Sequence, residues 1–321
     1  MAQRMGERQR WAWLAGGLSV TVSACACGLG WLWVLAGGLL AALYYIYMDT
    51  ALPTAGLASQ LPTAAAVVIL LWLVAVMAWS ANLADGAFPM IQGFPALGWT
   101  MLALAAWGSR KGPAACARCA GVLCLFWLIL YSAVVVFALP DVQTGNLIPY
   151  GAWKNGFWTA GLFLLPGAVW YLPCTRSRKK PAWVIGIALP LAAGVLAAVT
   201  AGVLSPLLAA SQPSPLYTLA QSVSLFGVVE RIEPLLSAAM VMGVFCLLSA
   251  MACACQSLFP WKWTGIAACV AAGALMGIAG KVDVAVVSVG NLVLFGVLPT
   301  ALILLQKKTS KKRKKPVDNG D

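Results

Sequence analysis

The stretch NLIPYGAWKNGFWTAGLFLLPGAVWYLP, residues 146–173, is apolar enough to lie within a membrane, yet it carries residues that weaken a helix. These helix-weakening residues are Gly151, Gly156, Gly161, Pro166 and Gly167. Polar groups accompany them at Lys154, Asn155 and Thr159. A membrane helix must satisfy its own backbone, so interruptions are tolerated mainly where neighbouring helices or a cavity receive the freed groups. We therefore predict a functional break in this segment; close packing of helices through small residues is the alternative.

Most of the remaining chain is equally apolar. Of the 321 residues, 62% are hydrophobic and 9% are charged, whereas soluble domains have about 25% charged residues. Apolar runs of about 18 residues or more indicate membrane-spanning helices. Ten such runs, numbered here as spans one to ten, occupy residues 11–29, 31–48, 63–84, 88–107, 114–139, 150–173, 182–204, 234–257, 263–280 and 284–306. The sequence thus predicts an all-α polytopic membrane protein.

No charged residue marks a loop between the first two spans, because residues 11–48 carry no charge. As one helix this stretch would be about 57 Å long, nearly twice the thickness of the hydrocarbon layer. The GLG triplet at residues 28–30 provides a turn. We therefore expect the chain to cross the membrane twice here.

Most basic residues fall on one side of the membrane when the chain crosses it ten times. They are Arg4, Arg8, Arg10, Arg110, Lys111, Arg118, Lys262 and the clusters at residues 176–180 and 307–315. The opposite loops and span ends carry Asp85, Asp141, Lys154, Lys281 and Asp283. Lysine and arginine accumulate in cytoplasmic loops, so we expect both termini in the cytoplasm. The predicted organisation is a basic N-terminus (1–10), a transmembrane domain (11–306) and a basic tail (307–321).

The residues that common enzymes use are missing from the sequence. It contains no histidine, which is the most common general base. One C-x-x-C motif, Cys116 to Cys119, has no second pair at zinc spacing. We therefore expect no enzymatic activity, metal or cofactor. The net charge of +12 follows from the loop asymmetry, so the tail is expected at anionic lipid and not on nucleic acid.

Span one contains Gly16-Gly17 followed by Ser19, Thr21 and Ser23. Spans one and six hold corresponding positions in two halves of five spans, and paired interrupted spans indicate a transporter-type site at an inverted repeat. Close packing is an equally weighted alternative for span one. The VSAC sequence at residues 22–25 also resembles a lipoprotein cleavage site. We expect an uncleaved first span, because nine further spans follow.

A charged triplet, Glu230, Arg231 and Glu233, directly precedes Pro234 and span eight. Because proline fits the first turn of a helix, we expect span eight to begin there. Residues 214–229 are expected to form an amphipathic helix on the outer face. The carboxylates would either cap the positive end of span eight, or line the outer vestibule together with Arg231.

Two stretches resemble the spore-germination permeases, the B subunits of endospore germinant receptors. FGVVERIEPLLSAAMVMGVFCLLSAMACACQSL, residues 226–258, resembles the family segment in which an arginine–x–glutamate pair opens span eight. NLIPYGAWKNGFWTAG, residues 146–161, resembles the stretch that leads into span six. The resemblance covers residues 139–321 with fair specificity and is weaker over the first 110 residues. It makes Arg231 and Glu233 the motif pair and places Asn146, Pro149 and Gly151 in the motif before span six.

The resemblance implies a fold like that of the amino acid–polyamine–organocation permeases, a LeuT-like 5+5 inverted repeat with broken spans one and six. Its members lie in the inner membrane of dormant spores with a larger membrane A subunit and a lipoprotein C subunit, and they sense nutrients such as amino acids. We expect the ligand between spans one, three, six and eight. Its expected partners are Ser19, Ser23, Trp79, Asn82, Gly156, Thr159 and Gly161.

Three functions remain open at this point. The first is a germinant-receptor subunit that binds a nutrient and transmits the occupancy of its pocket by a conformational rearrangement. The second is a secondary transporter of amino acids or another small solute. No Asp or Glu lies near the middle of a predicted span, which disfavours proton coupling. The third is a membrane scaffold that binds no ligand and only holds other subunits.

Overall fold

The computed structural model describes residues 5–25, 30–52, 56–86, 96–148, 151–175, 182–212, 215–222 and 233–313. Its transmembrane helices and helix fragments are α1 (Glu7–Cys25), α2 (Trp31–Ala51), α3 (Thr63–Gly86), α4 (Ala96–Lys111), α5 (Pro113–Ala138), α6 (Lys154–Phe163), η5 (Leu165–Tyr171), α7 (Ala182–Leu204), α10 (Glu233–Leu258), α11 (Thr264–Ala279), α12 (Val284–Asn291), η6 (Leu292–Val297) and α13 (Leu298–Arg313). The shorter elements are β1 (Met5–Gly6), η1 (Ala58–Gln60), η3 (Leu139–Asp141), η4 (Thr144–Leu147), β2 (Cys174–Thr175), α8 (Pro206–Ser211) and α9 (Pro215–Ser222).

Every predicted span coincides with one of these helices or with a run of consecutive elements, so the all-α polytopic prediction is confirmed. Five helical stretches within the described residues are long and apolar enough to cross a membrane by themselves. Span four begins later than expected, at Ala96, and residues 87–95 lie outside the described part of the chain. Spans six and ten are each composed of more than one helical segment.

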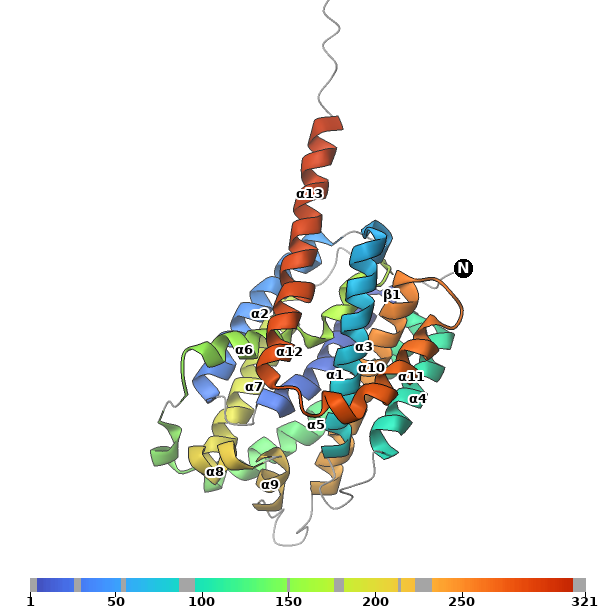
Figure 1. The fold of residues 1–321 in the computed structure, drawn as a ribbon. Coiled ribbons are helices and arrows are strands. Elements are labelled where there is room, and N and C mark those ends of the chain that lie inside the picture. The colour runs from blue at the N-terminus through green and yellow to red at the C-terminus, as the bar shows by residue number, and fades with distance from the viewer. Residues whose placement is uncertain are drawn as a thin grey trace, which may run out of the picture.

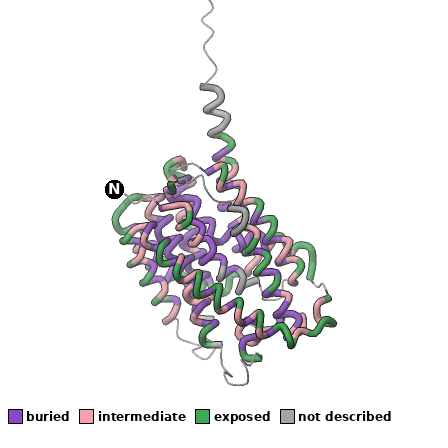
Figure 2. Tube along the Cα trace, turned by 180° about the vertical axis from the view of Figure 1, so that it is seen from behind, coloured by how far each residue is buried: buried purple, intermediate pink, exposed green. Residues whose placement is uncertain are grey.

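The helices form one bundle with its buried residues inside it (Figure 2). In it, α1 packs against α5 and α10, α2 packs against α6 and α7, and α3 packs against α11. The N-terminus and the projecting end of α13 lie at one end of the bundle, while α8 and α9 lie at the other (Figure 1). This arrangement agrees with the even number of spans. That the end with the termini faces the cytoplasm stays a prediction.

The described part of span one has no interruption at Gly16 and Gly17, because α1 is a continuous helix from Glu7 to Cys25. Residues 26–29, the end of the predicted span, lie outside the described part of the chain. Its two glycines serve close packing instead. A Cβ atom on Gly16 would lie 3.0 Å from Sγ of Cys246, and one on Gly17 would lie 2.9 Å from Cβ of Pro166. The glycines therefore let α1 approach α10 and the irregular part of span six.

Two short elements refine the sequence-based picture. The all-α expectation missed a parallel pair, in which Met5 of β1 lies opposite Cys174 of β2 and ties the N-terminus to the end of span six. The amphipathic helix expected at residues 214–229 is observed as α9, which ends at Ser222. Residues 223–232 lie outside the described part of the chain.

The close approach of α2 to α6 generates a prediction. A Cβ atom on Gly37 would lie 2.7 Å from Cβ of Thr159 and 2.8 Å from the backbone nitrogen of Ala160. Gly37→Ala must push the two helices apart, so we expect it to lower the free energy of unfolding by about 1–3 kcal/mol. The measurement is unfolding of the purified protein in mixed micelles.

The matched control is Gly277→Ala on α11, where a Cβ atom would meet no atom within 4 Å. This variant should be neutral or gain up to about 1 kcal/mol from the better helix propensity of alanine. Equal effects of the two substitutions would show that the contact between α2 and α6 is not tight.

Candidate functional site at the break in span six

Span six breaks where α6 ends and the tighter helix η5 begins. Pro166 has no N–H group, so the C=O of Leu162 lacks the partner that an α-helix would supply. The N–H of Gly167 donates to the C=O of Leu164 at 2.8 Å, and the C=O of Phe163 loses its helical partner as well. All of these residues are buried. The break thus places two backbone acceptors inside the bundle.

Hydroxyl groups of two other helices donate to these acceptors. Oγ1 of Thr21 on α1 donates to the C=O of Leu162 at 3.1 Å. The phenol of Tyr45 on α2 donates to the C=O of Phe163. Thr21 and Tyr45 are both buried. Spans one and two are therefore bound to the break through side-chain hydroxyls.

Span ten has a second irregular segment, the π-helix η6, packed against the first. The phenol of Tyr171 on η5 donates to the C=O of Leu294 at 2.7 Å. The phenol of Tyr44 on α2 donates to the C=O of Phe295 at 2.8 Å. A Cβ atom on Gly167 would lie 2.8 Å from Cβ of Phe295, so only glycine permits this contact. The two interrupted spans thus meet at their irregular segments.

Among the buried polar groups without a protein partner in the described part of the chain are the hydroxyl of Ser80 on α3, Nε1 of Trp170 on η5 and the amide nitrogen of Asn291 at the end of α12. The amide oxygen of Asn291 accepts from Nε1 of Trp72 at 3.1 Å. Buried polar groups normally have a partner, which here leaves water or a bound ligand to supply it.

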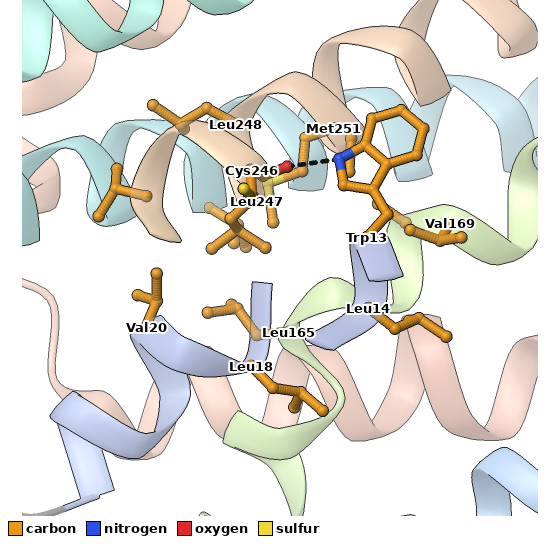
Figure 3. Packing of buried hydrophobic residues seen from close by; sticks show 14 of the residues in the cluster. Trp13, Leu14, Leu18, Val20, Leu165, Val169, Cys246, Leu247, Leu248 and Met251 are labelled. Atoms are coloured by element: carbon orange, nitrogen blue, oxygen red, sulfur yellow. Dashed lines mark hydrogen bonds between the residues drawn. The ribbon is translucent and has the colours of Figure 1, made fainter. Parts of the chain in front are cut away.

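The end of the bundle near the N-terminus is closed beneath the break. Arg10 forms an ion pair with Asp49 at the end of α2 and lies 5.7 Å from the ring centre of Trp170. Nε1 of Trp13 donates to the C=O of Cys246 at 2.8 Å (Figure 3). Figure 3 also shows apolar side chains of α1, η5 and α10 packed together; they include Leu14, Leu18, Leu165, Val169 and Leu247. Packed side chains thus fill the space between α1, η5 and α10 among the described residues.

Span six places its predicted ligand residues in tight helix contacts. Gly161 faces the backbone of Ser288 on α12, whose Cα would lie 2.7 Å from a Cβ atom on Gly161. Thr159 is buried, and its hydroxyl donates to the C=O of Asn155 at 2.8 Å. Gly156 is buried beside Gly37. These residues shape the junction of α6 with α2 and α12.

The predicted ligand residues of span three face α11. The amide of Asn82 donates to the C=O of Met276 at 2.8 Å, and Trp79 lines a cavity of about 230 Å³ with residues of α11 and α12. The backbones of Ser19 and Ser23 lie on α1, while their side chains lie outside the described part of the structure. Among the described residues, neither Trp79 nor Asn82 is seen in contact with the break.

The predicted motif residues lie partly outside the described chain, as Pro149, Glu230 and Arg231 do. Glu233 is the first residue of α10, and its side chain is not described. The amide of Asn146 donates to the C=O of Gly202 at 3.0 Å. Gly151 has φ +90°, a conformation that favours glycine. The motif before span six thus supports the backbone that leads into the break.

The described part of the chain contains no group of three or more metal-binding side chains. Its acidic residues with described side chains lie at or near helix ends or in loops: Glu7, Asp49, Asp85, Asp141 and Asp283. Asp85 accepts from the N–H of Gly98 at 2.9 Å, and Asp283 accepts from the N–H of Ala285 at 3.1 Å. The polar chemistry at the break therefore comes from backbone carbonyls, hydroxyls and an amide.

Three polar residues of this site were not singled out as ligand partners from the sequence: Thr21, Tyr45 and Asn291. The detectable signal was a polar side chain inside an apolar span, which is clearest for the amide of Asn291. Thr21 was recognised only as one of several hydroxyl residues of span one. Its role depends on a contact with span six, 141 positions away.

The fold has a solved counterpart. The crystal structure of MhsT in complex with L-phenylalanine is similar to this chain with a TM-score of 0.62 and 15% sequence identity. The alignment covers 95% of this chain and 90% of that chain. The LeuT-like fold is thereby confirmed. No protein-family model and no curated protein matches the sequence.

The hydroxyl of Thr21 generates a prediction. Thr21→Val keeps the shape of the side chain but removes the hydroxyl that donates to the C=O of Leu162, so we expect a loss of about 1–2 kcal/mol in the free energy of unfolding. The measurement is unfolding in mixed micelles, with melting temperature as a second readout.

Thr200→Val on α7 is the matched control. Thr200 is also buried, but its hydroxyl donates at 2.8 Å to the C=O of Leu196, four residues earlier in the same helix. That carbonyl keeps its backbone partner after the substitution. We expect a change below about 0.5 kcal/mol. An equal loss in the two variants would contradict the role assigned to Thr21.

Proposed function

We propose that the chain is the permease-like membrane subunit of a nutrient receptor and binds a small nutrient, an amino acid, where α1 meets the break in span six. The observation that carries this proposal is the pair of freed carbonyls at Leu162 and Phe163. They are held by Thr21 and Tyr45, two hydroxyl groups that lie on other helices. Breaks of this kind in transporter folds provide oriented backbone groups for a solute.

The chemistry of the break suits an amino acid. Carbonyl oxygens accept hydrogen bonds from an ammonium group, and exchange of a hydroxyl donor for a charged donor strengthens the bond. The unpartnered groups of Ser80 and Asn291 supply further polar contacts within the same bundle. The fold similarity to a protein crystallised with L-phenylalanine supports the same ligand class.

The finer assignment is a germinant receptor of endospores, with A and C subunits as partners and the spore inner membrane as location. Its support is the resemblance of residues 146–161 and 226–258 to spore-germination permeases. In such a receptor the ligand acts by favouring one conformation, for which a coupling of about 1–3 kcal/mol suffices. The closed end around Arg10 and Asp49 is the part that a conformational change would open.

A secondary transporter is the second candidate, and the fold favours it equally. No carboxylate among the described side chains lies at the break, which argues against proton coupling there. Counterflow uptake of an amino acid into liposomes would establish transport. Saturable binding without uptake would favour the receptor, and neither binding nor uptake would favour a scaffold.

Ligand binding is tested by the melting temperature of the detergent-purified protein with a panel of amino acids, including L-phenylalanine, and of sugars and nucleosides. An amino acid at about 100 times its Kd should add about 2.7 kcal/mol to the apparent stability. We expect one ligand class to stabilise the protein, with a larger ligand-induced shift in Thr21→Val than in Thr200→Val, because the ligand no longer competes with a hydroxyl for the C=O of Leu162. No shift with any candidate would contradict the proposed function.

Gly161 is a predicted ligand residue, but a Gly161→Leu variant is unsuitable for this test. Its side chain would collide with the backbone of Ser288 and would separate α6 from α12 irrespective of ligand. Comparison of Thr21→Val with Thr200→Val separates binding from folding, because each variant is measured with and without ligand.

The receptor assignment is tested in spores of the source organism. Deletion of the gene should abolish germination in response to the nutrient that stabilises the purified protein, and Arg231→Gln should weaken that response. Normal germination of the deletion strain with every nutrient would contradict the receptor assignment, while ligand binding by the purified protein would remain as evidence for a carrier.

A further inference from the structure

A cavity of about 650 Å³ opens at the end of the bundle where α4 and α10 end and α5 begins. This volume lies within the range of small-molecule sites. Its lining residues come from η1, the α4–α5 turn, the end of span six and the end of α10. Pro173 is one of them, and its C=O accepts from the N–H of Met5 at 3.3 Å. The cavity is therefore beside the N-terminus and separate from the break.

The charge of this cavity has one sign. Arg110 and Lys111 line it, and none of its lining residues is acidic. Within the described part of the chain neither cation forms an ion pair with a carboxylate. Arg110 instead lies 5.2 Å from the ring centre of Trp263, which holds its guanidinium near the α10–α11 turn.

Neutral polar groups also line this cavity. Gln256 and Ser257 of α10 are half-buried, and among the described residues their side chains have no hydrogen-bonding partner. Ser109 is buried, with its hydroxyl donating to the C=O of Ala106 at 2.8 Å. An amide and a hydroxyl that face an open cavity are free to donate to an occupant.

The combination selects a class of ligand. A guanidinium and an ammonium next to an amide and a hydroxyl match an anion with several oxygens better than a neutral solute or a cation. We propose that this cavity is a binding site for a phosphate-bearing anion, either a soluble phosphate compound or a phospholipid headgroup. Tyr171 of η5 and Cys253 of α10 also line the cavity, so an occupant contacts both the irregular part of span six and α10.

The test is the melting temperature of the full-length protein in detergent during a titration with inorganic pyrophosphate, with sodium chloride keeping the ionic strength constant. We expect a saturable rise in the wild type. Lys111→Gln should weaken the apparent affinity about tenfold, which corresponds to the loss of one charged hydrogen bond. Gln256→Leu, which leaves the charge unchanged, should weaken it as well.

Lys262→Gln is the matched control, because Lys262 lies 5.8 Å from the same Trp263 ring but does not line the cavity. Its affinity for pyrophosphate should equal that of the wild type. Equal weakening by Lys111→Gln and Lys262→Gln would show general attraction of anions to basic loops and would overturn the proposal. Absence of any pyrophosphate response in the wild type would overturn it too.

The two possible occupants, a lipid headgroup and a soluble phosphate compound, are distinguished in nanodiscs of phosphatidylcholine with and without phosphatidylglycerol. If the headgroup is the natural occupant, phosphatidylglycerol raises the melting temperature and suppresses the pyrophosphate response, and Lys111→Gln removes that rise. If the occupant is soluble, the pyrophosphate response is the same in both lipids. Either result supports the site.

Discussion

The backbone carbonyls of Leu162 and Phe163 lie inside the bundle without the N–H partners that a continuous helix would give them. In a membrane an unsatisfied carbonyl costs several kcal/mol, since no water replaces the missing donor. The hydroxyls of Thr21 and Tyr45 meet this requirement. The position of spans one and two around span six follows from it, and Gly17 gives α1 the room to approach Pro166.

The same requirement appears again in span ten. There the π-helix η6 presents carbonyls that Tyr44 and Tyr171 satisfy. Tyr171 lies on η5, so the irregular part of span six supports that of span ten directly. Carbonyls held by side-chain hydroxyls exchange partners more readily than carbonyls within a helix, because a ligand can replace a hydroxyl without unwinding the backbone. The carbonyls of these two segments can therefore change partners more readily than those of the regular helices, which is why we propose the ligand site there.

The break in span six was predictable because proline removes an N–H wherever the rest of the chain lies. The continuity of span one was not, since Gly16 and Gly17 serve a break and a close contact equally well in the sequence. The contact that decides between them lies on Cys246 and Pro166, far along the chain. The succession of membrane helices was predictable for a similar reason, because hydropathy acts locally.

The hydrogen-bond donors to the break, Thr21 and Tyr45, could not be predicted from the sequence. A threonine in a membrane helix can bind a carbonyl of its own helix, as Thr159 and Thr200 do, or one of another helix, as Thr21 does. Only the rotation of each helix distinguishes these cases. The rotation of α3 about its own axis likewise turns Trp79 and Asn82 toward α11. Residues 223–232, which contain most of the charged triplet, lie outside the described chain, so its role stays a prediction.

The most direct test combines Thr21→Val with Pro166→Ala in a double-mutant cycle on the free energy of unfolding. Alanine at 166 keeps the Cβ atom that faces Gly17 and restores an N–H that can donate to the C=O of Leu162. The hydroxyl of Thr21 then becomes dispensable. We expect Thr21→Val to cost about 1 kcal/mol less in the Pro166→Ala background than in the wild type. An identical cost in both backgrounds would contradict the claim that Thr21 satisfies a carbonyl freed by Pro166.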